Sequence, residues 1–264
     1  MPNEKESKGI VYVAHGSVFL EEAIVSASQC KTLLPDIPIC IITDQETEDS
    51  VFDHIIHLEY KQFHNDNINV KFGYKPYALS QTDLPFEKCL FLDTDTYLLD
   101  PGIRNLFSNL HEFDICMVQD HEDDQPSYKY PSGIIYNSGF ILFNNNEKIQ
   151  TIFNQWWNRM KKRINTIEDG YGRVGDQGFL TDIIYSRPSL NLLPLLKNYN
   201  FRFNGKQYIA GLVRVLHGRA NSFEYNAIAY ELNYTNQERI WDPETKKIEI
   251  IKTGTNFINS NLHK

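Results

Sequence analysis

The sequence predicts a single α/β domain in which a mostly parallel, Rossmann-like central sheet is flanked by helices. Short apolar, β-branched runs alternate along the chain with longer amphipathic segments, which is the order expected of successive β-α-β units. The 264 residues are 41% hydrophobic, enough for a sizeable core, and they contain no repeat or composition change that would mark a domain boundary. We therefore expect a domain at 9–222, a flexible N-terminus at 1–8 and a C-terminal extension at 223–264 packed on the same domain.

The first two expected strands enclose a helix. An apolar run at 10–14 is followed by a turn at 15–17, an amphipathic stretch at 20–34 and a second apolar run at 39–42. This order predicts a right-handed β-α-β unit. The turn contains only Gly16, so the glycine-rich fingerprint of dinucleotide-binding folds is missing, and the P-loop pattern is missing as well. Both absences argue against NAD, FAD or P-loop nucleotide chemistry.

An apolar run at 89–92 is the strand on which the functional interpretation depends, because it ends in Asp93 and Asp95. Four consecutive apolar residues predict a strand covered on both faces, and ligands bind at the carboxyl edge of such sheets. Side chains two residues apart on an extended backbone point the same way, so both carboxylates can converge on one divalent cation or on ligand hydroxyls. A solvated acidic turn is the alternative, because this spacing of two Asp residues also occurs by chance.

The remaining chain continues the alternation. We expect a strand at 53–58, a helix that starts at Tyr74 with Pro76 in its first turn, a helix at 103–110, strands at 114–118 and 136–144, a helix at 147–163, a helix that opens at Gly175, a strand at 213–218 and a hairpin within 240–251. The apolar residues at 152–160 have helical spacing, which is typical of a core-facing side. The acidic, proline-containing loop at 121–132 is either a mobile active-site loop or a plain solvated connection.

Charge and cysteine content narrow the range of partners and locations. The net charge of −8 argues against a nucleic-acid partner, because phosphate backbones require clustered Lys and Arg. Of the four cysteines, those at 40, 89 and 116 lie in apolar runs and none has metal-ligand spacing, so we expect reduced core residues. The N-terminus lacks the apolar core of a signal peptide, and no apolar stretch has membrane-spanning length. We expect a cytoplasmic protein without a transmembrane segment; its oligomeric state stays open, with a homodimer as one option.

A set of short motifs occurs in an order that resembles one enzyme family. The motifs are Lys75-Pro76-Tyr77, Phe91-Leu92-Asp93-Thr94-Asp95-Thr96, Tyr136-Asn137-Ser138-Gly139, Asp176-Gln177 and Leu216-His217-Gly218. Together they resemble the glycogenin-like glycosyltransferases, which include bacterial lipopolysaccharide galactosyltransferases, over about residues 9–220. The resemblance implies the nucleotide-sugar-binding fold called GT-A. It also implies transfer of a hexose from a nucleotide-diphosphate sugar, with a UDP-sugar as the expected donor, to a glycan or glycoconjugate hydroxyl with retention of anomeric configuration.

The same resemblance implies roles for individual residues. Asp93, Asp95 and His217 would hold a divalent metal, Mn²⁺ or Mg²⁺, that bridges the donor diphosphate, and this ligand set suits manganese. The expected catalytic residues are Asp176 and Gln177, beside the reacting face of the sugar, and Lys75, near the donor phosphates. For Lys75 a solvated helix-end lysine is the alternative, and for Asp176 a helix N-cap is a compatible role. Donor contacts are expected from Ala14, His15, Gly16, Asp44, Lys75, Thr94, Asn137, Ser138, Gly139, Gly218 and Arg219.

The sequence departs from the family pattern just after His217. Family members usually continue with glycine and then Lys-Pro-Trp, whereas this chain continues with Gly218-Arg219-Ala220. Arg219 can supply the positive charge for a diphosphate through its planar fork. Two other functions stay open: a nucleotide-sugar-binding protein without activity, and a haloacid-dehalogenase-type phosphatase. The phosphatase is disfavoured by Tyr97, which stands where that family has Thr or Val, and by the distance of Asp93 from the N-terminus.

The acceptor and the retaining mechanism are the least determined parts. We expect an external acceptor that approaches between the loop at 121–132 and the segment at 169–175. Modification of the protein's own Tyr128 or Tyr130 is the alternative. The sequence does not distinguish front-face transfer from a covalent glycosyl-aspartate.

Overall fold

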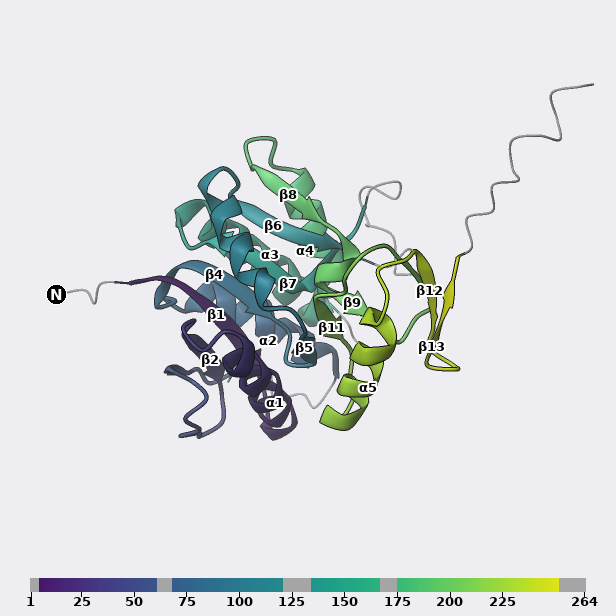
Figure 1. Cartoon of the computed structure of the whole chain (residues 1–264). Coiled ribbons are helices and arrows are strands. Elements are labelled where there is room, and N and C mark those ends of the chain that lie inside the picture. The colour runs from purple at the N-terminus through teal and green to yellow at the C-terminus, as the bar shows by residue number, and fades with distance from the viewer. Residues whose placement is uncertain (1–4, 61–67, 121–133, 167–174, 252–264) are drawn as a thin grey trace, which may run out of the picture.

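The structure, a computed structural model, describes residues 5–60, 68–120, 134–166 and 175–251. A seven-stranded sheet forms the middle layer, and helices cover both of its faces (Figure 1). The strand order is β3-β2-β1-β4-β7-β6-β8, and within this sheet β7 alone runs antiparallel to its neighbours. The expected α/β class with a mostly parallel central sheet is therefore confirmed.

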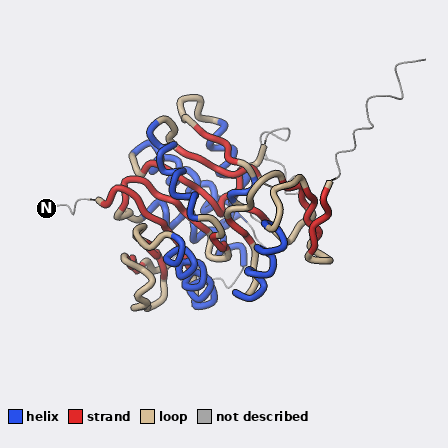
Figure 2. Tube along the Cα trace, in the orientation of Figure 1, coloured by secondary structure: helices blue, strands red, loops and turns tan. Residues whose placement is uncertain are grey.

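The chain alternates between strands and helices as the sequence predicts (Figure 2). The strands of the large sheet are β1 (Glu6–Ala14), β2 (Ile39–Thr43), β3 (His54–His57), β4 (Phe86–Leu92), β6 (Ile115–Gln119), β7 (Tyr136–Asn144) and β8 (Leu192–Leu195). The helices are α1 (Ser17–Leu33), α2 (Ile68–Gln81), α3 (Glu147–Thr166), α4 (Asp176–Tyr185) and α5 (Ser222–Asn233), with two 3₁₀ helices, η1 (Pro101–His111) and η2 (Lys197–Tyr199). β1, α1 and β2 form the expected β-α-β unit, with β1 and β2 parallel.

Buried residues of β4 alternate between two cores. Cys89 and Phe91 pack into the core between the sheet and helices α2, α3 and α4, whereas Leu90 and Leu92 pack into the core beneath α1 and η1. Because successive side chains of a strand face opposite sides of a sheet, a strand covered on both faces needs a continuous apolar run. The run at 89–92 is such a strand, and it brings the two carboxylates that follow it to the edge of the sheet.

A third core lies beyond that edge and is built from two small sheets and α5. One sheet contains β5 (Thr96–Leu98), β11 (Val215–His217) and β9 (Phe201–Arg202), and the other contains β10 (Gln207–Ile209), β12 (Arg239–Asp242) and β13 (Lys247–Ile250). The expected hairpin is the antiparallel pair β12-β13. Tyr97 of β5 stacks on Tyr225 of α5 with ring centroids 4.5 Å apart, and Trp241 of β12 is buried in the same core. The C-terminal residues thus contact the chain as it leaves β4.

Two expected helices differ in form from the prediction. The helix expected to start at Tyr74 begins at Ile68, so Pro76 lies in its interior instead of its first turn. Proline there removes one helical hydrogen bond, and the burial of Tyr74, Ala78 and Leu79 in the core compensates for this loss. The helix expected at 103–110 is the 3₁₀ helix η1, which Asp100 caps by accepting a hydrogen bond from the Gly102 N–H at 2.9 Å.

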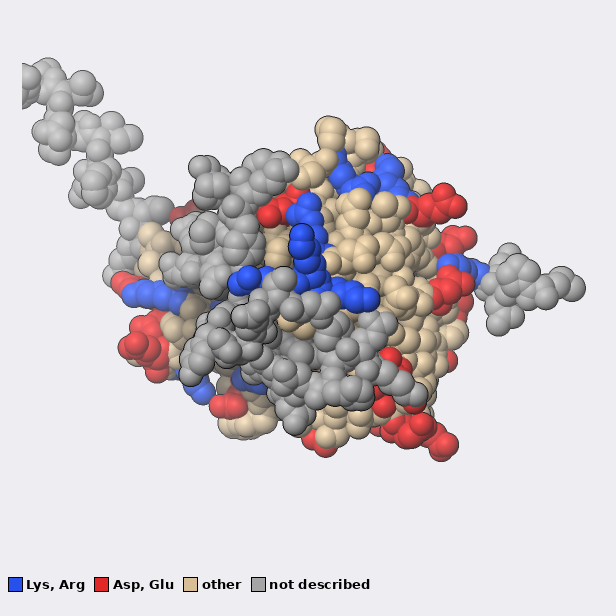
Figure 3. All heavy atoms as spheres, turned by 180° about the vertical axis from the view of Figure 1, so that it is seen from behind, with Lys and Arg blue, Asp and Glu red and all other residues tan. Residues whose placement is uncertain are grey.

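Other expectations concern the surface and the cysteines. All four cysteines are buried and free, as expected of core thiols. On the face seen from behind, Lys and Arg side chains gather near the centre and Asp and Glu lie mostly toward the rim (Figure 3). The negative net charge is therefore compatible with a locally basic surface.

None of the helices in the described ranges is long and apolar enough to cross a membrane. The loop at 121–132 lies outside the described residues.

Candidate active site

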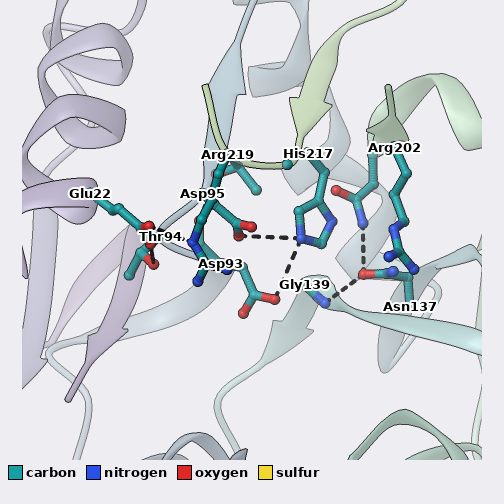
Figure 4. Close-up of polar contacts among 12 residues, drawn as sticks. Glu22, Asp93, Thr94, Asp95, Asn137, Gly139, Arg202, His217 and Arg219 are labelled. Carbon is teal, nitrogen blue, oxygen red and sulfur yellow. Dashed lines mark hydrogen bonds and ion pairs between the residues drawn. The ribbon is translucent and has the colours of Figure 1, made fainter. Parts of the chain in front are cut away.

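Asp93, Asp95 and His217 lie together at the carboxyl end of β4 (Figure 4). One possible ligand atom from each residue lies within 4.8 Å of the other two. The His217 Nε2 atom is 3.3 Å from Asp95 Oδ1 and 3.8 Å from Asp93 Oδ2. The structure therefore brings together the three residues that the resemblance assigns to a metal; we call them the ligand cluster.

Strand pairing explains how His217 reaches two residues more than a hundred positions earlier in the chain. β5 and β11 are antiparallel, and their register places His217 opposite Thr96, directly after Asp95. The Gly218 N–H then donates a hydrogen bond to the Asp95 carbonyl at 2.9 Å. Gly218 has φ 136°, a backbone conformation that side chains disfavour, so glycine is required at this turn. The conformation after β11 thus fixes the position of the imidazole.

Gly139 provides the space in which the ligand cluster lies. A Cβ atom at this position would lie 2.5 Å from His217 Cε1 and 2.7 Å from Asp93 Oδ2. The Gly139 carbonyl also accepts a hydrogen bond from the Asp93 N–H at 2.9 Å, which holds β7 against the turn after β4. A glycine is needed here because the backbone and the side chains of the ligand cluster approach each other so closely.

The charges of the ligand cluster depend on one another. Burial raises the pKa of Asp93, and the favourable charges of Lys75 and His217 only partly oppose this effect. Burial would also raise the pKa of Asp95, but the hydrogen bond and charge of His217, together with Arg219, lower it to about 2. For His217, burial would lower the pKa, yet Asp95 and Asp93 raise it above its ordinary value. The ligand cluster therefore combines the ionised carboxylate of Asp95, the Asp93 carboxylate with a pKa raised by burial, and the His217 imidazole with a raised pKa.

Lys75 connects the ligand cluster to a second polar group. Its Nζ atom lies 2.8 Å from Asp93 Oδ1 and 3.2 Å from Asp176 Oδ2, and it donates a hydrogen bond to Ser138 Oγ at 3.1 Å. Burial alone would lower the pKa of Lys75, but the carboxylates of Asp176 and Asp93 raise it, so the ammonium stays charged. The alternative of a solvated helix-end lysine is wrong, because the side chain is only 16% exposed.

A buried polar network extends from Lys75 away from the ligand cluster. It consists of Asp120, Asn137, Ser138, Asp176, Gln177 and Asn200, and we call it the polar network. Asp120 accepts hydrogen bonds from Asn137 Nδ2 at 2.9 Å and from Gln177 Nε2 at 2.6 Å. The Ser138 N–H donates to Gln177 Oε1 at 3.2 Å, and Asn200 Nδ2 donates to Asn137 Oδ1 at 2.8 Å. Two predicted catalytic residues, Asp176 and Gln177, thus lie beside the predicted donor-binding residues of β7.

Asp176 does not serve as the helix N-cap that the sequence allowed. It is the first residue of α4, and Gly175 occupies the cap position. Its Oδ2 atom instead accepts a hydrogen bond from Ser138 Oγ at 2.8 Å, and its carbonyl accepts one from Trp156 Nε1 at 2.9 Å. The carboxylate is therefore directed toward Lys75 and Ser138.

The other predicted donor-binding residues lie at the ends of β1 and β2. His15 Nδ1 lies 2.7 Å from Asp44 Oδ2, and the Gly16 N–H donates a hydrogen bond to Asp44 Oδ1 at 2.8 Å. The His15 ring lies against Tyr74, with centroids 4.8 Å apart. Ala14 is the last residue of β1. These residues lie at the same edge of the sheet as the ligand cluster, because β1 is parallel to both β2 and β4.

Sequence reasoning missed four residues that contact the site. Asp120 follows β6 just as Asp93 follows β4, and this shared pattern of an apolar strand ending in aspartate could have revealed it. Asn200 belongs to the polar network, and Arg202 Nη1 lies 3.6 Å from Asp120 Oδ1. Glu22 of α1 accepts hydrogen bonds from Thr94 and Arg219. For Asn200, Arg202 and Glu22 the sequence offers no comparable pattern.

Comparison with known proteins supports one enzyme class. Residues 84–204 match the family model described as nucleotide-diphospho-sugar transferase. This segment contains Asp93 and Asp95 of the ligand cluster and most of the residues around Lys75. This match and the shared fold support a GT-A-like glycosyltransferase. The match argues against the phosphatase alternative. A search of curated protein sequences found no significant match.

Solved glycosyltransferases share the fold of this GT-A-like chain. The galactosyltransferase LgtC, solved with donor and acceptor sugar analogs, has a TM-score of 0.58 and 13% identity, over 86% of this chain and 97% of its own. GlyE from Streptococcus pneumoniae has a TM-score of 0.54 and 14% identity over 92% of this chain, which spans only 59% of GlyE. Mouse xyloside xylosyltransferase 1 has a TM-score of 0.52 and 15% identity, over 82% of this chain and 99% of its own. At these identities the likeness concerns the fold.

Proposed function

We propose that this glycosyltransferase moves a hexose from a UDP-sugar to a hydroxyl of a glycan or glycoconjugate, in a metal-dependent reaction that retains the anomeric configuration. The observation that carries the proposal is the convergence of Asp93, Asp95 and His217 at the sheet edge. The family match supports a nucleotide-diphosphate sugar as the donor. The fold shared with LgtC, a galactosyltransferase solved with donor and acceptor sugar analogs, supports a hexose and a sugar acceptor.

The ligand cluster fits a hard divalent cation. Two carboxylates and one imidazole are donors that suit Mn²⁺ or Mg²⁺, with positions left for phosphate oxygens. Gly139 supports this reading, because any side chain there would occupy the space between His217 and Asp93. When bound, the metal would supply positive charge at the donor diphosphate.

Lys75 and the polar network suit the sugar end of the donor. In the reaction the bond between the anomeric carbon and the phosphate oxygen breaks, the acceptor oxygen bonds to that carbon, and the acceptor proton passes to the departing phosphate. Lys75 would stabilise the negative charge that develops on the phosphate, because its ammonium is held beside the cluster by Asp93 and Asp176. Asp176 is paired with Lys75 and Ser138, which favours an electrostatic role toward the positively charged sugar over a role as nucleophile.

Calorimetry tests the metal and the nucleotide together. We expect UDP to bind in the presence of Mn²⁺ and to lose most of its affinity when a chelator is added. Equal affinity in both conditions would remove the metal from the proposal. A thermal-shift panel of nucleotide sugars with Mn²⁺ then tests the donor, since a ligand that binds the folded state raises its melting temperature. A larger shift with guanosine diphosphate sugars would reject the choice of uridine.

Product analysis tests retention and the acceptor. An NMR spectrum of the product should show the same anomeric configuration as the donor, and an inverted product would contradict the proposal. Intact mass spectrometry after incubation with donor and Mn²⁺ should show no added hexose on the protein. Hexose additions that vanish in a Tyr128→Phe/Tyr130→Phe variant would instead indicate self-modification. Both tyrosines, and the segments expected to border the acceptor apart from Gly175, lie outside the described residues.

A further inference from the structure

We propose that Glu22 is a positioning residue for the donor diphosphate, and that it acts by orienting the guanidinium of Arg219 beside the ligand cluster. This inference rests on the proposed function, because it requires a nucleoside diphosphate at Asp93, Asp95 and His217. The inference gives α1 a role in ligand binding, whereas its sequence pattern indicates only a helix that packs on the core.

Glu22 joins two segments that are far apart in the sequence. Its Oε2 atom accepts a hydrogen bond from Thr94 Oγ1 at 2.9 Å, and its Oε1 atom accepts one from Arg219 Nε at 2.6 Å (Figure 4). Thr94 stands between the two aspartates of the ligand cluster, and Arg219 follows His217 by two residues. One carboxylate, 20% exposed, therefore ties α1 to both segments that supply the cluster.

The contacts of Arg219 leave its terminal amino groups available for a ligand. Its Nε–H is used by Glu22, and its guanidinium carbon lies 5.5 Å from the ring centroid of Phe19 on α1. Within the described ranges the two Nη groups make no hydrogen bond. Arg219 lies next to Asp95 in Figure 4, and its charge contributes to the low pKa of Asp95. The Arg219 guanidinium is held in place through its Nε–H, and its two Nη groups can donate hydrogen bonds to two oxygens of a phosphate.

Glu22 is expected to affect binding more than folding. The Arg219 side chain is 63% exposed, and an exposed arginine adopts many rotamers, so holding one orientation before the ligand arrives lowers the entropic cost of binding. An ion pair whose arginine is this exposed adds little to stability. The loss of Glu22 should therefore weaken the binding of a phosphate by Arg219 and leave the melting temperature of the protein nearly unchanged.

Calorimetry with UDP and UMP, both at saturating Mn²⁺, tests the proposal. We expect Glu22→Gln to weaken UDP binding by about tenfold, the effect of one charge-assisted hydrogen bond. Binding of UMP should stay within about twofold of wild type, because UMP lacks the second phosphate that we assign to Arg219. Glu21→Gln is the matched control: it removes the same charge from the neighbouring, exposed position of α1 and should bind both nucleotides like wild type.

A double-mutant cycle shows whether Glu22 acts through Arg219. Glu22→Gln should have no further effect on UDP binding in an Arg219→Gln background, because the group that it positions is then missing. Full additivity of the two losses, equal weakening of UDP and UMP, or unchanged UDP affinity in Glu22→Gln would each overturn the inference. Failure of the wild-type protein to bind UDP with Mn²⁺ would instead reject the proposed function, so the two failures are distinguishable.

Discussion

The two sides of Lys75 differ in how their polar groups are satisfied. In the polar network, the side-chain amides of Asn137 and Gln177 donate to Asp120 at 2.9 and 2.6 Å, and the Ser138 hydroxyl donates to Asp176 at 2.8 Å. Within the described chain, Asn200 Oδ1 is left without a partner in this network. In the ligand cluster, two carboxylates and an imidazole lie close together, and within the described chain His217 Nδ1 has no hydrogen-bond partner. A buried network in which most polar groups are paired adds rigidity, whereas concentrated charge is better satisfied by a ligand than by the protein. We therefore expect Asp120, which pairs with Asn137 and Gln177, to affect mainly stability, and the ligand cluster to affect binding and turnover.

The largest expected effect is the loss of turnover in Asp95→Ala. Removing one cluster carboxylate should lower the rate by a factor on the order of 10³, in line with losses of charge stabilisation at other active sites. The melting temperature should change little, because Asp95 lies after the end of β4 and belongs to none of the three cores. Transfer assays and thermal melts measure both. Asp83→Ala, which removes an exposed carboxylate, serves as the control and should leave turnover unchanged. Retained turnover in Asp95→Ala would show that the ligand cluster is not the catalytic centre.

A second expected effect is the loss of metal binding in Gly139→Ala. The added methyl group would contact His217 and Asp93 at distances that force a rearrangement, so we expect manganese-dependent UDP binding to disappear and stability to fall by about 1–3 kcal/mol. Calorimetry and denaturant unfolding check the two effects. In Gly175→Ala the new Cβ atom meets nothing within 4 Å, so this variant should resemble wild type. Normal UDP binding by Gly139→Ala would show that the cluster tolerates displacement.

Asp120→Asn tests the contribution of the polar network to stability. The Asp120 side chain is buried and accepts hydrogen bonds from Asn137 and Gln177, so an amide in its place would direct an N–H group toward one of these donors. We expect stability to fall by about 1–3 kcal/mol, measured by denaturant unfolding. UDP binding with Mn²⁺ should persist at a temperature where the variant is folded. Unchanged stability with lost UDP binding would reverse the roles that we assign to the two regions.

The last expected effect is thermal stabilisation of the wild-type protein by Mn²⁺ alone. A metal that binds the folded cluster at about 100 times its dissociation constant stabilises by about 2.7 kcal/mol, and a weaker site by less. We expect the melting temperature to rise with Mn²⁺ in wild type and in Asp120→Asn, but not in Asp95→Ala. A rise in Asp95→Ala equal to that in wild type would place the metal elsewhere.

The sequence by itself determined the central sheet and its binding edge. The run at 89–92 is apolar throughout because β4 is covered on both faces, and this local pattern is enough to predict the strand and the two carboxylates at its end. The motif order allowed the enzyme class to be expected, and the comparisons confirm it. These features can be predicted from the sequence because each depends on neighbouring residues or on spacing within one strand or helix.

Only the tertiary structure decided how distant side chains meet, although the family resemblance led us to expect His217 beside Asp93 and Asp95. The register of β5 and β11 places His217 beside Asp95, and the packing of α1 on the turn after β4 places Glu22 against Thr94 and Arg219. Pro76 lies inside α2 because buried neighbours compensate for a lost hydrogen bond, which overrides the local tendency of proline to begin a helix. Contacts between residues more than seventy positions apart leave no periodic pattern in the sequence, since each partner is selected by the packing of whole helices and strands.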